Sequence, residues 1–366
     1  MRMPLGLAAV AASLHLIFAC GSDSQSSPPP LDQSEAGVRT GVPEASTDAG
    51  EAGCSADVVV DPKNCGRCGH DCLGGACERG ACQPVRLAVD RSNLLWMAID
   101  ATHVYFCEDA VQRLGRVPKA GGAVELVASA CTYTYGAAVI DDTNIYVNEQ
   151  GGIRVVPKQG LGAGSLILPG ATAFAVDATN LYLLEVQSGG TGGMRLSRAA
   201  KPAGTPVTIG GLTSPGRVAH DATKLYVTDV DGIRQFSKTA APGGPDAGSS
   251  LFVGGAPEPA DVAVDSMYVY YASQTTGSVK RATKVGGSVD IVASGVNAPS
   301  AVAVDASGVY FASASAGLIM SCPLAGCPGD PHVLASLQAE PYGIAIDDVA
   351  VYWITQSGGT VMRVAK

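Results

Sequence analysis

The feature of this sequence that most limits its fold is a pair of residues, an Asp followed five positions later by a Tyr. The pair occurs seven times, at intervals of 36 to 44 residues, beginning at Asp100, Asp141, Asp177, Asp221, Asp265, Asp305 and Asp347. The surrounding residues also repeat, as in AVDASGVYFAS at 303–313 and AIDDVAVYWIT at 345–355. Seven occurrences with one internal spacing indicate an array of repeats rather than coincidence.

Each repeat has the pattern of four short strands. An apolar strand precedes the Asp, whose carboxylate is suited to a tight turn because it can accept a backbone N–H two residues on. An aromatic and β-branched strand follows, such as NLYLL at 180–184, then a third such as GIRVVPK at 152–158 and a fourth such as VELVAS at 124–129. A period of about 40 residues in such a sequence predicts an all-β, seven-bladed β-propeller of four-stranded blades over 85–366.

The two ends of the repeat array complement each other. The last repeat stops at Lys366 without a fourth strand, and an unused apolar strand begins at Val85. We therefore expect the N-terminal strand to close the last blade, which removes the open edge that a propeller would otherwise expose.

The composition agrees with many short strands and tight turns. The chain has 46 Gly in 366 residues, 16% charged residues and a formal net charge of −9. No cluster of Lys and Arg stands out, so nucleic acid is not expected as a partner.

The N-terminus has the form of an export signal. Residues 1–20 contain Arg2, an apolar run and then Ala19-Cys20, which looks like a bacterial lipobox with Cys20 as the lipidated residue. The alternative is ordinary cleavage nearby that removes Cys20. Gly21 is not the Asp that retains lipoproteins in the inner membrane, which favours an outer-membrane lipoprotein of the bacterial cell envelope, facing the periplasm or the cell surface. Residues 21–53 lack large apolar side chains and are expected to form a disordered tether.

A cysteine-rich module is expected at 54–84. Its six cysteines are Cys54, Cys65, Cys68, Cys72, Cys77 and Cys82. The exported context favours three disulfides over a zinc site, and the sequence leaves 15 pairings open. Two further disulfides are expected in the propeller, Cys107 with Cys131 and Cys322 with Cys327.

Two resemblances follow from these motifs. GIAIDDVAVYW and AVAVDASGVYFAS resemble the blades of YWTD and NHL-type β-propellers, although YWTD domains are commonly six-bladed and most of their Trp residues are missing here. The NCGRCGHDC…GAC…GAC spacing resembles the cysteine-rich modules of plant stigma-specific secreted proteins. These resemblances imply a fold and an extracellular module, and they imply no particular chemistry.

Enzyme signatures are not found in the sequence. There is no G-x-S-x-G elbow, and His70, His103, His220 and His332 sit in unrelated positions, so no catalytic residue, metal site or cofactor is predicted. His220 replaces the apolar residue that precedes the Asp in the other repeats, and a packed or solvated histidine is the expected explanation.

One position suggests a ligand-binding rim. Three residues after each repeat Tyr the chain has Glu108, Glu149, Glu185 and Asp229, then Ser273, Ser313 and Thr355. These groups can be structural, with hydrogen bonds inside the blades, or they can form an acidic arc for a cation or basic peptide. The same face is expected to hold Tyr133, Tyr135, Glu258, Glu340 and Tyr342.

The sequence therefore predicts a monomeric, membrane-anchored lipoprotein whose propeller is a non-catalytic binding scaffold for an unknown protein, peptide or glycan. The alternative is a propeller enzyme of the lactonase or lyase type, with a metal at the channel mouth.

Overall fold

The computed structural model describes residues 57–129, 131, 136, 138–159, 164–186, 193–239, 249–256 and 259–366. These residues are almost entirely strands and turns, with one short 3₁₀ helix among them, η1 (Asp109–Val111). None of the helical structure in these ranges is long and apolar enough to span a membrane.

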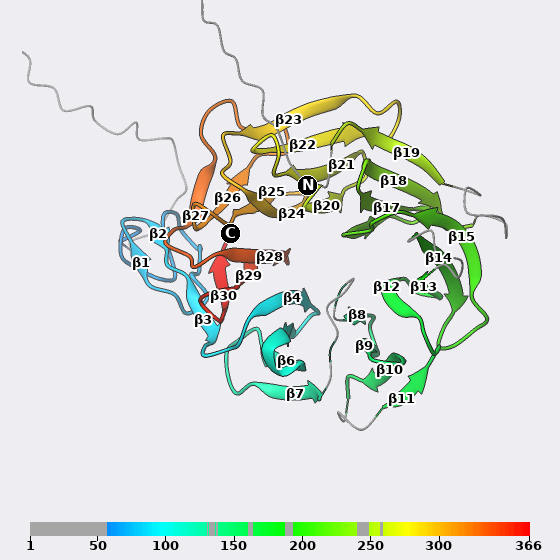
Figure 1. Ribbon diagram of the computed structural model, residues 1–366. Helices are drawn as coiled ribbons and strands as arrows, with labels where there is room; N and C mark the ends of the chain where they lie inside the picture. The colour runs from blue at the N-terminus through cyan, green and yellow to red at the C-terminus, as the bar shows by residue number, and fades with distance from the viewer. Residues whose placement is uncertain are drawn as a thin grey trace, which may run out of the picture. The chain divides into compact units, whose positions relative to one another are not determined.

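Seven antiparallel four-stranded sheets make up the propeller, and Figure 1 shows them as blades arranged in a ring around a common axis. The blades confirm the predicted fold. In the order from the channel outward, the first three blades consist of β4 (Leu94–Ile99), β5 (His103–Glu108), β6 (Arg113–Pro118) and β7 (Glu125–Ala128); β8 (Ala138–Ile140), β9 (Asn144–Glu149), β10 (Gly152–Pro157) and β11 (Ser165–Ile167); and β12 (Thr172–Val176), β13 (Asn180–Val186), β14 (Met194–Ala200) and β15 (Val207–Leu212).

The remaining blades have the same order. They consist of β16 (Val218–His220), β17 (Lys224–Asp229), β18 (Gly232–Ser237) and β19 (Ser249–Gly254); β20 (Asp261–Val264), β21 (Tyr268–Ser273), β22 (Ser278–Thr283) and β23 (Val289–Ser294); β24 (Pro299–Asp305), β25 (Gly308–Ser313), β26 (Leu318–Cys322) and β27 (His332–Ala335); and β28 (Pro341–Ile346), β29 (Ala350–Thr355), β30 (Thr360–Ala365) and β3 (Val85–Ala88).

The last blade is closed as the sequence predicted. β3 pairs antiparallel with β30, with Val85 opposite Arg363 and Arg86 opposite Met362. Leu87 and Ala88 are buried in a cluster that also contains residues of β5 and β29. The N-terminal strand thus joins the first part of the repeat array to the last.

The repeated Asp and Tyr residues are bonded to each other within each blade. In six of the seven described blades the Tyr hydroxyl donates to the Asp Oδ2, over 2.7 to 3.4 Å. In the sixth blade Ser307 lies between the two, and its Oγ is 2.8 Å from the hydroxyl of Tyr310. The other Asp oxygen accepts backbone N–H groups of the turn, as at Asp177 with Thr179 and Asn180.

A lysine from the following blade completes this arrangement. We call each such Lys–Asp contact between neighbouring blades a seam. Six seams are described: Lys158–Asp100 (2.9 Å), Lys201–Asp141 (2.6 Å), Lys238–Asp177 (3.2 Å), Lys284–Asp221 (2.7 Å), Lys119–Asp347 (2.7 Å) and Lys366–Asp305. The strand register places Leu324 at the lysine position of the sixth blade, where the disulfide Cys322–Cys327 lies instead.

The seams lower the pKa of their carboxylates. Burial by itself would raise the pKa of Asp141, but hydrogen bonds from Lys201 and from two backbone N–H groups outweigh it and lower the pKa to about 2. Burial and the neighbouring Asp141 raise the pKa of Tyr146 to about 12. The pKa of each of the other five seam Asp residues is also lowered, against the effect of burial.

These pKa values predict a loss of stability in acid. A carboxylate whose folded pKa lies below its unfolded value of about 3.9 stabilises the fold above that pH and stops doing so as the pH falls through the folded pKa. We expect the free energy of unfolding, measured with denaturant, to change little between pH 7 and pH 5 and to fall steeply from about pH 4 to pH 2. Equal stability at pH 7 and pH 2 would show that the seams do not contribute.

The cysteine-rich module packs against the last blade. Its only described strands, within 57–82, are β1 (Cys77–Glu78) and β2 (Ala81–Cys82), joined as a hairpin. Cys65 pairs with Cys77 and Cys72 with Cys82, and Cys68 is also disulfide-bonded. Arg363 of β30 donates to the carbonyl of Leu73, so the module is fastened to the strand that β3 closes. Cys54 and Cys20 lie outside the described residues.

The two disulfides expected in the propeller are present. Cys107 at the end of β5 pairs with Cys131, and Cys322 pairs with Cys327. Both join parts of a single repeat, so they brace individual blades.

Candidate ligand-binding site

The inner strands of the blades carry four side chains that depart from the repeat. The residue directly before the repeat Asp is Ile or Val in six blades and His220 in the fourth. Four positions before the Asp, the residues are Trp96, Ala137, Ala173, Arg217, Asp261, Ala301 and Gly343. Most are small, which suits strands that crowd around a channel, so Trp96, Arg217 and Asp261 stand out.

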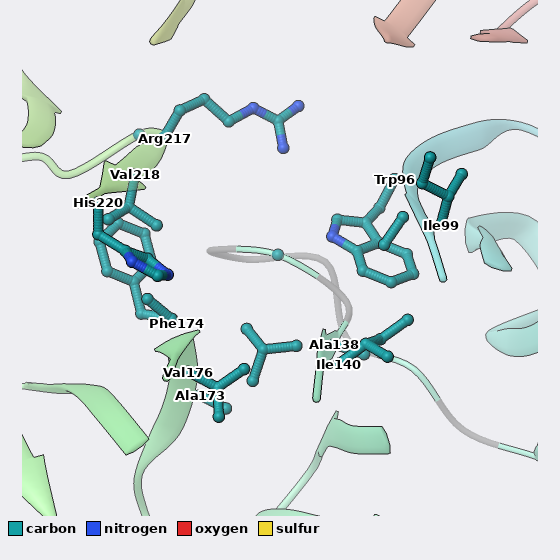
Figure 2. Close-up of a pocket in the computed structure, with 15 residues that line it drawn as sticks. Trp96, Ile99, Ala138, Ile140, Ala173, Phe174, Val176, Arg217, Val218 and His220 are labelled. Atoms are coloured by element: carbon teal, nitrogen blue, oxygen red, sulfur yellow. The ribbon is translucent and has the colours of Figure 1, made fainter. Parts of the chain in front are cut away.

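Three of these unusual residues line one cavity. It has a volume of about 290 Å³ and lies in the channel between the inner strands of the first four blades. Its wall contains Trp96, Phe174, Arg217 and His220, and is otherwise made of small or branched apolar residues and glycine. Figure 2 shows Trp96 and His220 on opposite sides of this space, with the guanidinium of Arg217 extending over it.

Arg217 is held by residues of other blades. Its guanidinium donates to the hydroxyl of Tyr342 on β28 over 3.1 Å and lies 5.4 Å from the centre of that ring. Burial raises the pKa of Asp261, while the charge of Arg217 and backbone N–H groups of β20 and β24 oppose that shift. Arg217 is therefore positioned across the channel, from the fourth blade toward the seventh.

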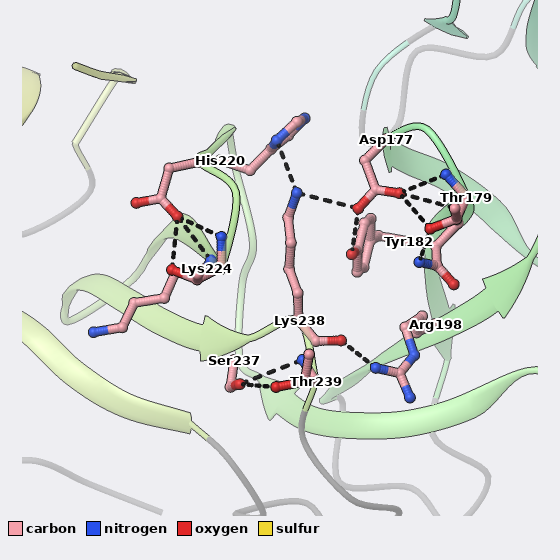
Figure 3. A network of polar contacts seen from close by, with 12 residues as sticks. Asp177, Thr179, Tyr182, Arg198, His220, Lys224, Ser237, Lys238 and Thr239 are labelled. Atoms are coloured by element: carbon pink, nitrogen blue, oxygen red, sulfur yellow. Dashed lines mark hydrogen bonds and ion pairs between the residues drawn. The ribbon is translucent and has the colours of Figure 1, made fainter. Parts of the chain in front are cut away.

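His220 is tied to the seam between the third and fourth blades. Its Nδ1 lies 3.1 Å from Nζ of Lys238, which is also 3.2 Å from Asp177 (Figure 3). His220 is exposed and lies in the wall of the cavity. Burial first, and then the charge of Lys238, lower the pKa of His220, which makes the imidazole neutral at neutral pH.

The four acidic residues predicted for a binding rim all have arginine partners. The nearest ion pairs are Arg91 with Glu108 (3.5 Å), Arg154 with Glu149 (2.7 Å), Arg195 with Glu185 (3.6 Å) and Arg234 with Asp229 (3.3 Å). Asp229 also accepts the backbone N–H groups of Thr213 and Ser214, and its side chain is fully buried. These contacts match the structural interpretation of the position, and a role in ligand binding stays a prediction.

The other residues predicted for the same face lie in different surroundings. Tyr342 joins Arg217 at the channel, whereas Glu340 is exposed in the turn before β28. Ser273, Ser313 and Thr355 are buried and hydrogen-bond within their blades, Ser313 to the carbonyl of Asn297. Tyr133, Tyr135 and Glu258 lie outside the described residues.

One group with metal-ligand spacing occurs in the described part of the chain, formed by Cys65, Cys72 and Cys82. All three sulfurs are in disulfides, and a metal requires the thiolate, so their proximity reflects two stacked disulfides.

The sequence interpretation overlooked Arg217 and the cavity role of Trp96, and it treated His220 as a packed or solvated residue. The signal that identifies them is a departure from the residue types that the other blades share at the same position. An alignment made to detect the repeat treats such departures as noise.

Comparisons with known proteins agree with the fold. No protein-family model matches the chain, and no curated protein matches it. A streptogramin B lyase structure is 14% identical with a TM-score of 0.60, covering 78% of this chain and 97% of that one. A catalytically inactive virginiamycin B lyase from Staphylococcus aureus with quinupristin is 12% identical with a TM-score of 0.59, covering 78% and 98%. The Pan2 WD40 domain from Neurospora crassa is 8% identical with a TM-score of 0.56, covering 77% and 95%. At such identities the likeness shows the fold alone, and this chain is a seven-bladed β-propeller.

Proposed function

We propose that the protein is a membrane-anchored binding protein of the bacterial cell envelope that holds its ligand in the channel cavity without transforming it. One observation carries this proposal: Trp96, Arg217 and His220, which break the repeat on different inner strands, line the same cavity. Aromatic side chains beside a few placed polar groups are the usual wall of a ligand pocket.

The size of the cavity limits what enters it. A volume of about 290 Å³ suits a small molecule, or one side chain or end group of a larger peptide, protein or glycan. A larger partner would therefore place one residue in the channel and rest the remainder on the face around it.

Binding is tested with Trp96 as the reporter. The chain has two Trp residues, and Trp353 is fully buried with its Nε1 bonded to Gln338 over 3.1 Å, so Trp353→Phe leaves the cavity residue as the sole indole. We expect ligands from a chemically diverse library to change the emission of this variant, and Trp96→Phe in the same background to remove the signal. A library in which no compound changes the emission or the melting temperature contradicts the proposal.

The enzyme alternative of the lactonase or lyase type requires a metal at the channel mouth. Elemental analysis of the purified protein distinguishes it, because a binding protein of the proposed kind contains no stoichiometric divalent metal. A bound metal that is needed for turnover of a lactone would favour the alternative.

The membrane anchor is tested at Cys20. If this residue is lipidated, Cys20→Ser is expected to release the protein in soluble form or to stall its processing. Fractionation and mass spectrometry of the mature N-terminus measure both results. Unchanged membrane association with an unmodified N-terminus would end the lipoprotein interpretation.

A further inference from the structure

The cavity wall has three polar side chains, which decide what kind of ligand group can be satisfied there. Among the lining residues these are Trp96, Arg217 and His220, and the remaining side chains are apolar or absent. The indole of Trp96 and the guanidinium of Arg217 are hydrogen-bond donors with no acceptor atom. His220 can present either kind of atom, depending on which ring nitrogen carries the proton.

The contact with Lys238 settles the protonation of His220. A lysine ammonium has three donors and no acceptor, so the Nδ1 that lies 3.1 Å from it has to be the acceptor. Asp177 lies 3.2 Å from the same ammonium and is itself bonded to Tyr182 over 2.7 Å. These contacts form the network that Figure 3 shows.

We infer that Lys238 fixes His220 as the neutral tautomer with its proton on Nε2, so that all three polar side chains of the cavity wall are donors and the ligand is a carboxylate with an apolar body. This inference rests on the proposed function and adds the ligand class. Each donor needs an acceptor when water leaves the cavity, because an unsatisfied buried polar group is unfavourable. A carboxylate supplies several acceptor sites in one group, and the five N–H donors of a guanidinium let Arg217 bind it in addition to its contacts with Tyr342 and Asp261.

The apolar part of the ligand follows from the rest of the wall. Phe174, Val218 and the small residues of β8 and β12 offer no polar side-chain atoms, so the remainder of the ligand is hydrocarbon or aromatic. Such a group occurs in a free arylalkyl acid and at the C-terminus of a peptide that ends in an apolar residue. The two sources share the same chemistry and are separated by the choice of probe.

The tautomer is measured directly in the unmodified protein. We expect long-range proton–nitrogen correlation spectra of ¹⁵N-histidine-labelled protein at pH 7.5 to show His220 with a protonated Nε2 and an unprotonated Nδ1. A ring protonated on Nδ1, or on both nitrogens, would overturn the inference without any variant. Comparison with the spectrum of His220→Gln identifies the signal.

A matched pair of variants then tests the role of Lys238. Lys238→Met removes the contact with the ring and is expected to let the proton distribute between both nitrogens. Lys201→Met removes the equivalent seam between the second and third blades, where Val176 stands in place of the histidine, and should leave the His220 signal unchanged. A change of equal size in both variants would show a general effect of losing a seam.

Ligand class is tested with four probes on the Trp353→Phe protein. We expect 3-phenylpropionate to bind at least ten-fold more tightly than 3-phenylpropionamide, and the peptide Gly-Gly-Phe to bind better than its C-terminal amide if peptides are the source. Arg217→Met should abolish the preference, and Arg113→Met, at an exposed arginine outside the cavity, should preserve it. Amides that bind as well as acids, or a library whose ligands are all neutral or cationic, would overturn the ligand class and leave the proposed function intact.

Discussion

A chain that begins at residue 90 is expected not to fold into a soluble propeller. It lacks β3, so the edge of β30 is unpaired and the apolar cluster that contains Leu87 and Ala88 is opened. An open apolar strand edge is a site of aggregation. A chain that begins at residue 51 keeps every described strand and all ten cysteines after Cys20, and it should remain folded, which circular dichroism and size-exclusion chromatography can compare.

A point substitution tests the same closure with less damage. Leu87→Ala leaves the strand in place and removes a buried side chain, which should lower the free energy of unfolding by about 2–5 kcal/mol. The neighbouring Arg86 is exposed, and Arg86→Ala should change it by less than about 0.5 kcal/mol. Equal effects at the two positions would show that β3 is not part of the cooperative fold.

The second large effect is expected at a seam. Asp177→Asn keeps an oxygen that can accept from the turn, and its NH2 can donate to the Tyr182 hydroxyl, but it removes the charge that compensates Lys238, whose side chain is 7% exposed. Loss of one partner of a buried ion pair leaves the other charge uncompensated, so we expect unfolding to become easier by about 3 kcal/mol. Denaturant titration of both variants measures the difference from wild type.

Asp265→Asn is the matched control for this prediction. Asp265 makes the same turn contacts and the same bond with Tyr270, but the described residues place Leu324, and no lysine, at the matching position of the next blade. Its replacement should therefore cost less than about 1 kcal/mol. If both variants lose equal stability, the turn and the Tyr bond are responsible and the lysines contribute little.

The fold was predictable because its signal is repeated. One spacing that recurs seven times specifies the blades, and the apolar strand at Val85, which precedes the first repeat, supplies the strand that closes the ring. The pairing between Lys238 and Asp177 was not predicted, because the lysine of one blade reaches the aspartate of the previous one and the two are 61 residues apart. Cysteine pairing in the module was also open, since spacing alone does not tell which side chains meet.

The candidate site was harder to predict for the opposite reason. Trp96, Arg217 and His220 form no motif in sequence, and they come together only because four inner strands surround one channel. The acidic residues at the end of the second strands did form a pattern, which suggested an arc of like charge. In the structure each of them is paired with an arginine, such as Arg91 beside Glu108. The distance in sequence between arginine and acid is not the same in all four pairs, so no regular spacing predicts these pairs.

The direction of the seams also sets an order of assembly. Lys158 meets Asp100 as soon as the second blade has been made, but Lys119 needs Asp347, which is made 228 residues later. At about 5–20 residues per second, translation would leave Lys119 and β3 without their partners for roughly 10–50 s. The first and seventh blades are thus the last to be enclosed on both sides. During this interval β3 is the segment of the growing chain with most need of a chaperone.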